Sequence, residues 1–273
     1  MRIMETAEGI CLERNPYLDL GKSFNCGQAF RFEPEADGYA GVVGDLVLRI
    51  REEPDRYVFR GLDTARFESV VRPFLDLDRD YAAAERTFLS DPVLAQAAQY
   101  GRGIRILRQD PFETLITFIF SQNNNIPRIR GMVRRLCEGF GAPLGGGCYA
   151  FPSARTLAGL AVEDLAPVRA GFRAKYAVDA ARRVCDGSVP LSQLASLPYP
   201  QARALLMTIR GVGAKVADCV LLFGAGRLEA FPVDVWVKRA CARFYPGGQT
   251  PDFGPYAGLA QQYLFHYIRG LSA

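Results

Sequence analysis

The sequence predicts an α+β fold, with a small antiparallel sheet near the N-terminus followed by a mostly helical body. Three observations lead to this expectation. Residues 38–60 contain three short runs of strand-forming residues, apolar residues recur with helical spacing from about Asp63 onward, and one helix carries clear start signals at Asp110. At 273 residues the chain is long enough for two packed units. We expect an α+β domain over residues 1–105 and a helical domain over residues 106–273.

The expected sheet is a β-meander. Its three strands cover residues 39–43, 46–51 and 56–60. Gly44 and Asp45 form a two-residue hairpin signal between the first two strands, and a polar run at residues 52–55 joins the second strand to the third. The pattern therefore predicts an antiparallel sheet at this point of the chain.

The clearest helix begins at Asp110, a residue type that favours the N-cap. Pro111 takes the first helical position, and Glu113, three residues after the cap, completes a capping box. One face of the helix carries the apolar residues Phe112, Leu115, Ile116, Ile119 and Phe120. We expect this helix to pack into a core and to end in the polar run 121–125.

A second helix is expected to begin near Pro127. Its inward face carries Ile129, Met132, Val133 and Leu136, and its outward face carries Arg128, Arg130, Arg134 and Arg135. A glycine-rich linker is expected over residues 139–147, followed by shorter helices near 153–168 and 173–185. From about Asp63 the chain is expected to stay helical to its end.

The net charge of +4 is unevenly distributed. Residues 1–100 carry 12 basic and 18 acidic side chains, a net charge of −6, so residues 101–273 carry 21 basic and 11 acidic side chains, a net charge of +10. A split of this size suggests that the basic part binds a polyanion. Lysine is scarce, which leaves few candidates for amine chemistry: Lys22, Lys175, Lys215 and Lys238.

Histidine and cysteine usage excludes several kinds of site. A zinc site built from several histidines is impossible, because His266 is the only histidine. The seven cysteines are odd in number and contain no Cys-x-x-Cys pair, which indicates free thiols in a reducing compartment. The sequence begins without the pattern of a signal peptide and has no apolar run of the ~18 residues that span a bilayer. We expect an intracellular protein, in the cytoplasm or nucleoid of a bacterium or in a eukaryotic nucleus.

The most informative stretch is a helical hairpin over about residues 199–222. Gly211 and Gly213 separate its two helices, and glycine permits positive φ and a close approach of main-chain N–H groups to a partner. The N-terminus of the second helix also favours an anion. These features predict a site for backbone phosphate, although the glycine pair alone is more typical of a plain turn between helices.

Lys215 and Asp234 are the candidate catalytic pair. Lys215 lies in the first turn of the exit helix, where the helix dipole disfavours a cation and favours the neutral, nucleophilic amine. Asp234 follows an apolar loop and precedes a helical run, which predicts an N-cap carboxylate. Taken singly, a solvated lysine and a purely structural cap are the simpler interpretations.

With these motifs the chain resembles the helix-hairpin-helix DNA glycosylases, and within them the 8-oxoguanine DNA glycosylase/abasic-site lyases. The resemblance rests on Gly211–Lys215 followed by Val233-Asp234-Val235. Further matching segments are residues 26–31, 121–128, 215–219 and 256–265. These segments follow the family's order over nearly the whole chain.

The resemblance implies a bifunctional glycosylase and lyase. In such an enzyme Lys215 attacks C1′ of the damaged nucleotide, expels the base and forms a Schiff base that leads to β-elimination of the 3′ phosphate. Asp234 stabilises the positive charge that develops on the sugar, an effect often worth ~3–4 kcal/mol. The partner implied is duplex DNA that contains 8-oxoguanine opposite cytosine, bound by a monomer.

The resemblance also implies a pocket for a flipped base. The carbonyl oxygen of Gly27 accepts the N7 proton that 8-oxoguanine has and guanine lacks. Cys219 and Phe265 enclose the base, and Gln261, one helical turn before Phe265, binds its Watson–Crick edge. Because extrusion of a nucleotide leaves a gap in the duplex, Asn123 is expected to fill that gap.

Further contacts with DNA are implied for the residues around the pocket. Arg128 reads the opposite cytosine, and Phe172 stands where the family has a wedge tyrosine, with Arg173 beside it. Trp236 replaces a phosphate-contacting histidine of eukaryotic members, and Arg210 replaces a proline.

No redox cofactor is expected. No cysteine follows Cys241, so the four-cysteine iron–sulfur loop of the related endonuclease III branch is expected to be missing. The family's hairpin often binds a structural monovalent or calcium ion through main-chain oxygens, which correspond here to Met207, Ile209 and Val212.

Two alternatives remain open. The first is a helix-hairpin-helix glycosylase for another damaged purine, such as an alkylated or ring-opened base. The second is a non-catalytic DNA-binding module that uses the hairpin only for phosphate.

Overall fold

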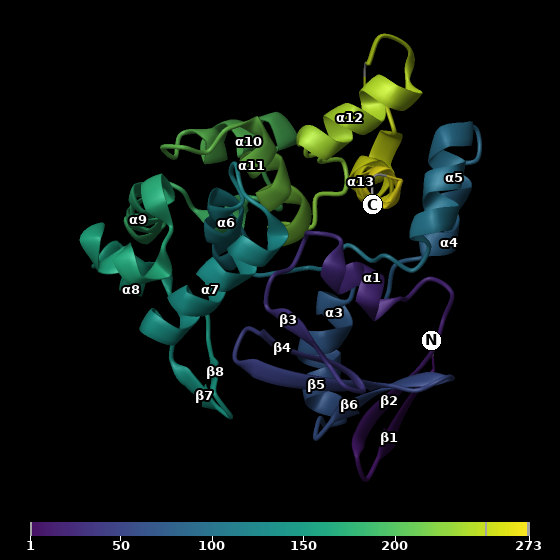
Figure 1. The fold of residues 1–273 in the computed structure, drawn as a ribbon, viewed down its shortest axis with the longest axis horizontal. Helices are drawn as coiled ribbons and strands as arrows, with labels where there is room; N and C mark the ends of the chain where they lie inside the picture. Colours follow the sequence, from purple (N-terminus) through teal and green to yellow (C-terminus); the bar gives the residue numbers. More distant parts are fainter. Residues whose placement is uncertain (1, 249, 272–273) are drawn as a thin grey trace.

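The computed structural model describes residues 2–248 and 250–271, and it places a β-sheet at one end of a helical body (Figure 1). Within these residues the sheet has six antiparallel strands in the order β1-β2-β6-β5-β4-β3. Their bounds are β1 Ile3–Thr6, β2 Gly9–Glu13, β3 Phe32–Glu35, β4 Gly38–Val43, β5 Leu46–Glu52 and β6 Arg56–Arg60. The α+β fold class is therefore confirmed.

The predicted meander corresponds to β4, β5 and β6. Gly44 has φ of +60° in the turn between β4 and β5, as a two-residue hairpin requires. The sequence pattern missed the other three strands. Pro34 lies within β3. A proline is tolerated there because β3 is an edge strand, whose outer side has no partner strand.

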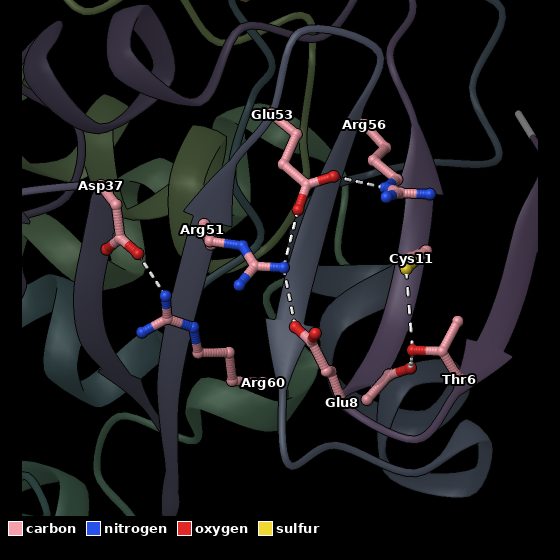
Figure 2. Close-up of polar contacts among 9 residues, drawn as sticks. Thr6, Glu8, Cys11, Asp37, Arg51, Glu53, Arg56 and Arg60 are labelled. Atoms are coloured by element: carbon pink, nitrogen blue, oxygen red, sulfur yellow. Dashed lines mark hydrogen bonds and ion pairs between the residues drawn. The ribbon is translucent and has the colours of Figure 1, made fainter.

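The two faces of the sheet differ in polarity. Ion pairs cover one face, where Arg51 contacts Glu8 and Glu53 at 2.7 Å each and Arg56 contacts Glu53 at 2.5 Å (Figure 2). Side chains alternate between the faces of a strand, so Ile50, next to Arg51, points to the buried face. The sheet thus packs on one side only, against a core whose largest members include Ile10, Leu12, Phe24, Phe59 and Phe67.

The helical body begins after the sheet, as the sequence predicts. Its helices, together with α1 of the sheet region, are α1 Leu20–Asn25, α2 Thr64–Arg66, α3 Arg72–Phe74, α4 Tyr81–Arg86, α5 Pro92–Gly101, α6 Pro111–Phe120, α7 Ile126–Phe140, α8 Ala154–Ala158, α9 Ala174–Cys185, α10 Tyr199–Met207, α11 Ala214–Cys219, α12 Val235–Phe244 and α13 Ala257–Gly270. Two π-helical segments, Phe67–Val71 and Val220–Gly224, continue α2 and α11. None of the helices in the described residues is long and apolar enough to span a membrane.

The helix predicted after Asp110 is α6. The Asp110 carboxylate accepts hydrogen bonds from the backbone N–H groups of Phe112 and Glu113 at 2.9 and 2.8 Å, so the predicted cap is present. The Glu113 carboxylate pairs with Arg31 at 3.1 Å, and this contact ties α6 to the segment that leads into β3. The other half of the predicted capping box is thus replaced by a tertiary ion pair.

One part of the expected linker is a strand pair. The second predicted helix, α7, runs on to Phe140, and β7 (Pro143–Gly145) then pairs with β8 (Cys148–Tyr149). The three glycines at residues 145–147 all have positive φ, which lets the chain reverse within a tight turn. The expectation of a purely helical chain after Asp63 is therefore wrong at this short hairpin.

Three hydrophobic clusters lie under these elements in the described residues. One lies beneath the sheet, the largest joins α4 through α13, and the smallest contains Val237, Cys241 and Phe265. Helix α5 packs against α13 in the largest cluster, and the Tyr263 hydroxyl donates to Glu85 at 3.0 Å, which fixes α13 to α4. The division into domains near residue 105 stays a prediction.

Candidate active site

A cavity of about 540 Å³ opens between the turn after α6, the helix α11, the N-terminus of α12 and one face of α13. Such a volume suits a ligand of the size of a nucleobase with part of its sugar. Many of the residues singled out from the sequence line it: Gly27, Asn123, Lys215, Cys219, Asp234, Trp236, Gln261 and Phe265. The fold thus brings together segments that are more than 200 residues apart in the chain.

The hairpin between α10 and α11 sets the position of Lys215. Gly211 has φ of +82°, and a Cβ atom there would lie 2.5 Å from the ring of Tyr176 on α9. Gly213 has an extended backbone, with φ of −96°, and a Cβ atom there would meet open space. Only Gly211 therefore needs glycine for its conformation, whereas Gly213 leaves the backbone surface uncovered ahead of α11.

Lys215 lies in the first turn of α11, at the wall of the cavity. Its amine donates a hydrogen bond to the Ser121 hydroxyl at 2.9 Å and lies 4.9 Å from the centre of the Phe118 ring. The Ser121 hydroxyl in turn donates to the Phe118 carbonyl oxygen at 2.7 Å. This chain holds the amine at the turn that follows α6.

Asp234 is the N-cap of α12, as the sequence predicts. Its Oδ1 atom accepts hydrogen bonds from the N–H groups of Trp236 and Val237 at 2.9 and 2.8 Å. These bonds fix the direction in which the carboxylate points. Asp234 also lines the cavity, so capping orients this carboxylate at the same opening as the Lys215 amine.

One wall of the cavity is suited to a flat aromatic ligand. Gly27 has φ of +82°, and a Cβ atom there would lie 3.4 Å from the Phe265 ring. Cys219 is buried, and burial raises the pKa of its thiol to about 12, so it presents a neutral surface. Gln261 and Phe265 lie one turn apart on α13, and Gln261 is buried at the cavity wall.

The buried side chain of Arg173 forms hydrogen bonds to the turn after α6. The Arg173 guanidinium donates from Nε to the Gln122 carbonyl oxygen at 2.8 Å and from Nη2 to the Asn123 carbonyl oxygen at 2.9 Å. Asn123 itself has φ of +46°, an uncommon backbone conformation for a residue other than glycine. Arg173 is buried, and burial, together with the nearby charge of Arg128, lowers its pKa. Arg173 therefore supports the turn from inside the protein.

The other residues that the sequence singled out lie around the cavity and do not line it. Arg128, in the first turn of α7, is exposed, and Phe172 is 50% exposed in the short 3-10 turn Gly171–Arg173 just before α9. The Phe172 ring packs against Tyr176, the residue beneath Gly211. The hairpin carbonyls of Met207, Ile209 and Val212 belong to the turn itself, where Ile209 accepts from the N–H of Val212 at 3.0 Å.

Seven polar residues of the cavity received no role from the sequence. They are Ser121, Gln122, Asn124, Asn125, Lys238, Gln262 and Arg269. Ser121 begins the noted polar run and Gln262 follows Gln261, but sequence adjacency gave no signal that either would face the site. The guanidinium of Arg269 lies 5.2 Å from the Phe265 ring, which adds positive charge to this wall of the cavity. Among the described residues, no group of three or more His, Cys, Asp or Glu side chains is placed to hold a metal ion.

Comparison with known proteins gives consistent results. Residues 11–115 match the N-terminal domain of 8-oxoguanine DNA glycosylase, and residues 116–253 match the HhH-GPD superfamily of base excision DNA repair proteins. An N-glycosylase/DNA lyase of Arabidopsis thaliana is 32% identical over 91% of this chain and 76% of its own length. A probable N-glycosylase/DNA lyase of Methanothermobacter thermautotrophicus is 33% identical over 67% of this chain and 69% of its own.

Similarity in structure extends over the whole chain. The 8-oxoguanine glycosylase/lyase of Clostridium acetobutylicum, solved with duplex DNA that carries cytosine opposite 8-oxoguanine, superposes with a TM-score of 0.94 at 34% identity. The match covers 100% of this chain and 99% of that one.

Proposed function

The chain belongs to the HhH-GPD superfamily of base excision DNA repair proteins, and we propose that it excises 8-oxoguanine from duplex DNA with Lys215 as the nucleophile. It is a DNA repair glycosylase with lyase activity. One observation carries the proposal for the site: the Lys215 amine and the Asp234 carboxylate line the same cavity, one on each of two helix N-termini. A nucleophile next to a fixed negative charge suits a reaction in which the sugar becomes positively charged.

The chemistry follows from these two groups. The amine attacks C1′ of the extruded nucleotide, and the bond to the base breaks as the base leaves. The departing base takes up the proton that the amine gives up, and the sugar ring opens at its C1′–O4′ bond, which leaves a protonated Schiff base at C1′. The Schiff base loses a proton at C2′ and expels the 3′ phosphate by β-elimination, which cuts the strand. The hydrogen bond from Lys215 to Ser121 supports this role, because it holds the amine at one place before the DNA arrives.

Recognition of the base is assigned to the wall of the cavity that Gly27, Cys219 and α13 form. The Gly27 carbonyl accepts the N7 proton of 8-oxoguanine, Cys219 and Phe265 enclose the base, and Gln261 binds its Watson–Crick edge. Undamaged guanine has an acceptor at N7, which would leave two acceptors facing each other in a buried site. Two observations support this assignment: Gly27 has a positive φ, and a Cβ atom there would lie 3.4 Å from the Phe265 ring.

The DNA is held by groups around the cavity. Asn123 fills the gap left by the extruded nucleotide, Arg128 contacts the opposite cytosine, and Phe172 is the wedge. Gly211, Gly213 and Trp236 lie along the strand that carries the lesion. The exposure of Arg128 and Phe172 supports these roles, since both side chains are free to reach a duplex.

No step requires a redox cofactor or an iron–sulfur cluster, because the lysine supplies the nucleophile. The hairpin carbonyls of Met207, Ile209 and Val212 are oxygen ligands of the kind that suits a sodium, potassium or calcium ion. Such an ion would stiffen the hairpin turn, which is the part proposed to contact the DNA phosphate. We also propose that the protein acts as a monomer inside the cell.

A panel of duplexes tests the proposal. Each duplex carries 8-oxoguanine, an alkylated purine or guanine opposite cytosine, and the products are separated on a gel after incubation with and without borohydride. We expect excision and strand cleavage at 8-oxoguanine and a trapped covalent adduct. Lys215→Gln should abolish the adduct and lower excision at least ~10³-fold. Adduct formation by Lys215→Gln, or preference for the alkylated purine, would reject the proposal.

A further inference from the structure

Two glutamines follow one another on α13 at the wall of the cavity. Gln261 and Gln262 are each 3% exposed, and both line the cavity. The Nε2 group of Gln262 donates a hydrogen bond to Oε1 of Gln261 at 2.7 Å. The two side chains therefore form a buried amide pair beside the site assigned to the base.

The amide pair fixes which end of Gln261 is available. A side-chain amide has an acceptor oxygen at one end and a donor NH2 group at the other. The Gln261 oxygen already accepts from Gln262, and the Gln261 Nε2 group makes no hydrogen bond to the described residues. The free donor is thus what Gln261 offers to a ligand.

The arrangement is not the one that stability alone would favour. The Oε1 atom of Gln262 is buried and has no hydrogen-bond partner among the described residues. An unpaired buried acceptor lowers stability, and an apolar side chain of the same length would not carry this cost. An amide at residue 262 is therefore better explained by what it does to Gln261 than by packing.

We propose that Gln262 is a positioning residue, which holds the Gln261 amide with its donor toward the extruded base. Because the ligand in question is the extruded base, this role rests on the proposed function. A donor facing the Watson–Crick edge pairs with the 6-oxo group of a guanine-type base and opposes the 6-amino group of an adenine-type base, which is itself a donor. Without Gln262 the Gln261 amide can turn by half a rotation and offer its oxygen to a 6-amino group.

Gln262→Met tests this role, because methionine keeps the length and apolar stem of the side chain and removes the amide. Single-turnover excision is measured on matched duplexes with 8-oxoguanine and with 8-oxoadenine. We expect excision of 8-oxoguanine to fall about tenfold and that of 8-oxoadenine to fall less or to rise, so that the preference decreases. The thermal midpoint should not fall. Gln99→Met, at an exposed glutamine of α5 outside the cavity, is the matched control.

Two further measurements separate positioning from a general structural effect. Cleavage at a preformed abasic site, where no base occupies the pocket, should change by no more than about twofold in Gln262→Met. In a Gln261→Met background, Gln262→Met should cause no additional loss of 8-oxoguanine excision, because the residue acts through Gln261.

The outcomes are distinguishable. Equal loss of base excision and of abasic-site cleavage, additive effects of the two substitutions, or an unchanged base preference would overturn the role of Gln262 and leave the proposed function standing. If the unsubstituted protein does not excise 8-oxoguanine, the proposed function fails, and the role of Gln262 in it fails as well.

Discussion

At the scale of single residues, two arginines of the basic region have opposite environments. The sequence suggested a contact with DNA for both Arg128 and Arg173. The structure leaves Arg128 exposed and buries Arg173, whose guanidinium binds the carbonyl oxygens of the turn at Asn123. Residue type alone cannot separate these cases, because the partners of Arg173 lie about 50 residues away in the sequence.

This difference predicts separate effects on stability and on binding. Arg173→Ala removes a buried side chain and leaves two carbonyl oxygens of the turn without its donors, so the free energy of unfolding should fall by at least about 2 kcal/mol. Arg128→Ala should change it by less than ~0.5 kcal/mol and weaken DNA binding instead. Urea unfolding and fluorescence anisotropy measure the two quantities. Equal stability of the two variants would contradict the structural role of Arg173.

Asp234 combines two roles that a single substitution can separate. Asparagine is as good an N-cap as aspartate, so Asp234→Asn should keep the free energy of unfolding within ~0.5 kcal/mol. The loss of the negative charge should slow excision about 10²- to 10³-fold while DNA binding stays nearly unchanged. Single-turnover kinetics and anisotropy measure these effects. Asp80→Asn, at the N-cap of α4 outside the cavity, is the control, and a comparable loss of excision in that variant would refute the assignment.

At the scale of elements, strong local signals were sufficient for some segments and not for others. The meander, α6, α7 and the hairpin of α10 and α11 were predicted because turn residues, caps and periodic apolar residues agree within each segment. The edge strands β1 and β3 lack an alternating apolar pattern, and pairing with neighbours determines them. The short hairpin of β7 and β8 looked like a linker for the same reason.

The hairpin turn offers a matched pair of glycine substitutions. Gly211→Ala places a Cβ atom against the Tyr176 ring at positive φ, and we expect a loss of about 1–3 kcal/mol in the free energy of unfolding. Gly213→Ala fits its extended backbone and open surroundings, so stability should be retained. If the backbone at Gly213 approaches a phosphate, the added methyl group should weaken DNA binding. Thermal unfolding and anisotropy on both variants give the comparison, and equal destabilisation would rule out this account.

At the scale of the whole molecule, the two parts of the chain that differ in net charge form different parts of the fold. Residues 1–100, which carry a net negative charge, form the sheet, where acidic side chains pair with basic ones, as Glu8 and Glu53 do with Arg51. The basic residues 101–273 supply nearly all of the cavity and its surroundings. Among the residues that the structure describes, the N-terminal part contributes Cys26, Gly27 and Phe30 to the cavity.

This distribution predicts a strong dependence of DNA binding on salt. Removing one side chain that binds a phosphate should reduce the slope of log K against log salt concentration by about 1. We therefore expect a smaller slope for Lys238→Ala, at the exposed rim of the cavity. Arg49→Ala, in an ion pair with Glu35 on the sheet, should leave the slope unchanged. Fluorescence anisotropy between about 50 and 200 mM salt measures this slope. An equal effect of both substitutions would argue against a DNA-facing helical body.

The sequence by itself determined the α+β class, the main helices, the hairpin and the candidates Lys215 and Asp234. Caps, turns and periodicity act within a few residues, so local physics is sufficient for the class, the helices and the hairpin. The two candidates depended in addition on the resemblance of the whole set of motifs to a known family. Only the tertiary structure decided that Gly27, Lys215, Asp234 and Gln261 share one cavity, that Arg173 is buried, and that Gln262 fixes the amide of its neighbour. These facts depend on how α6, α11, α12 and α13 pack, and packing between distant segments is set by the shape of the whole core, which no short stretch of sequence contains.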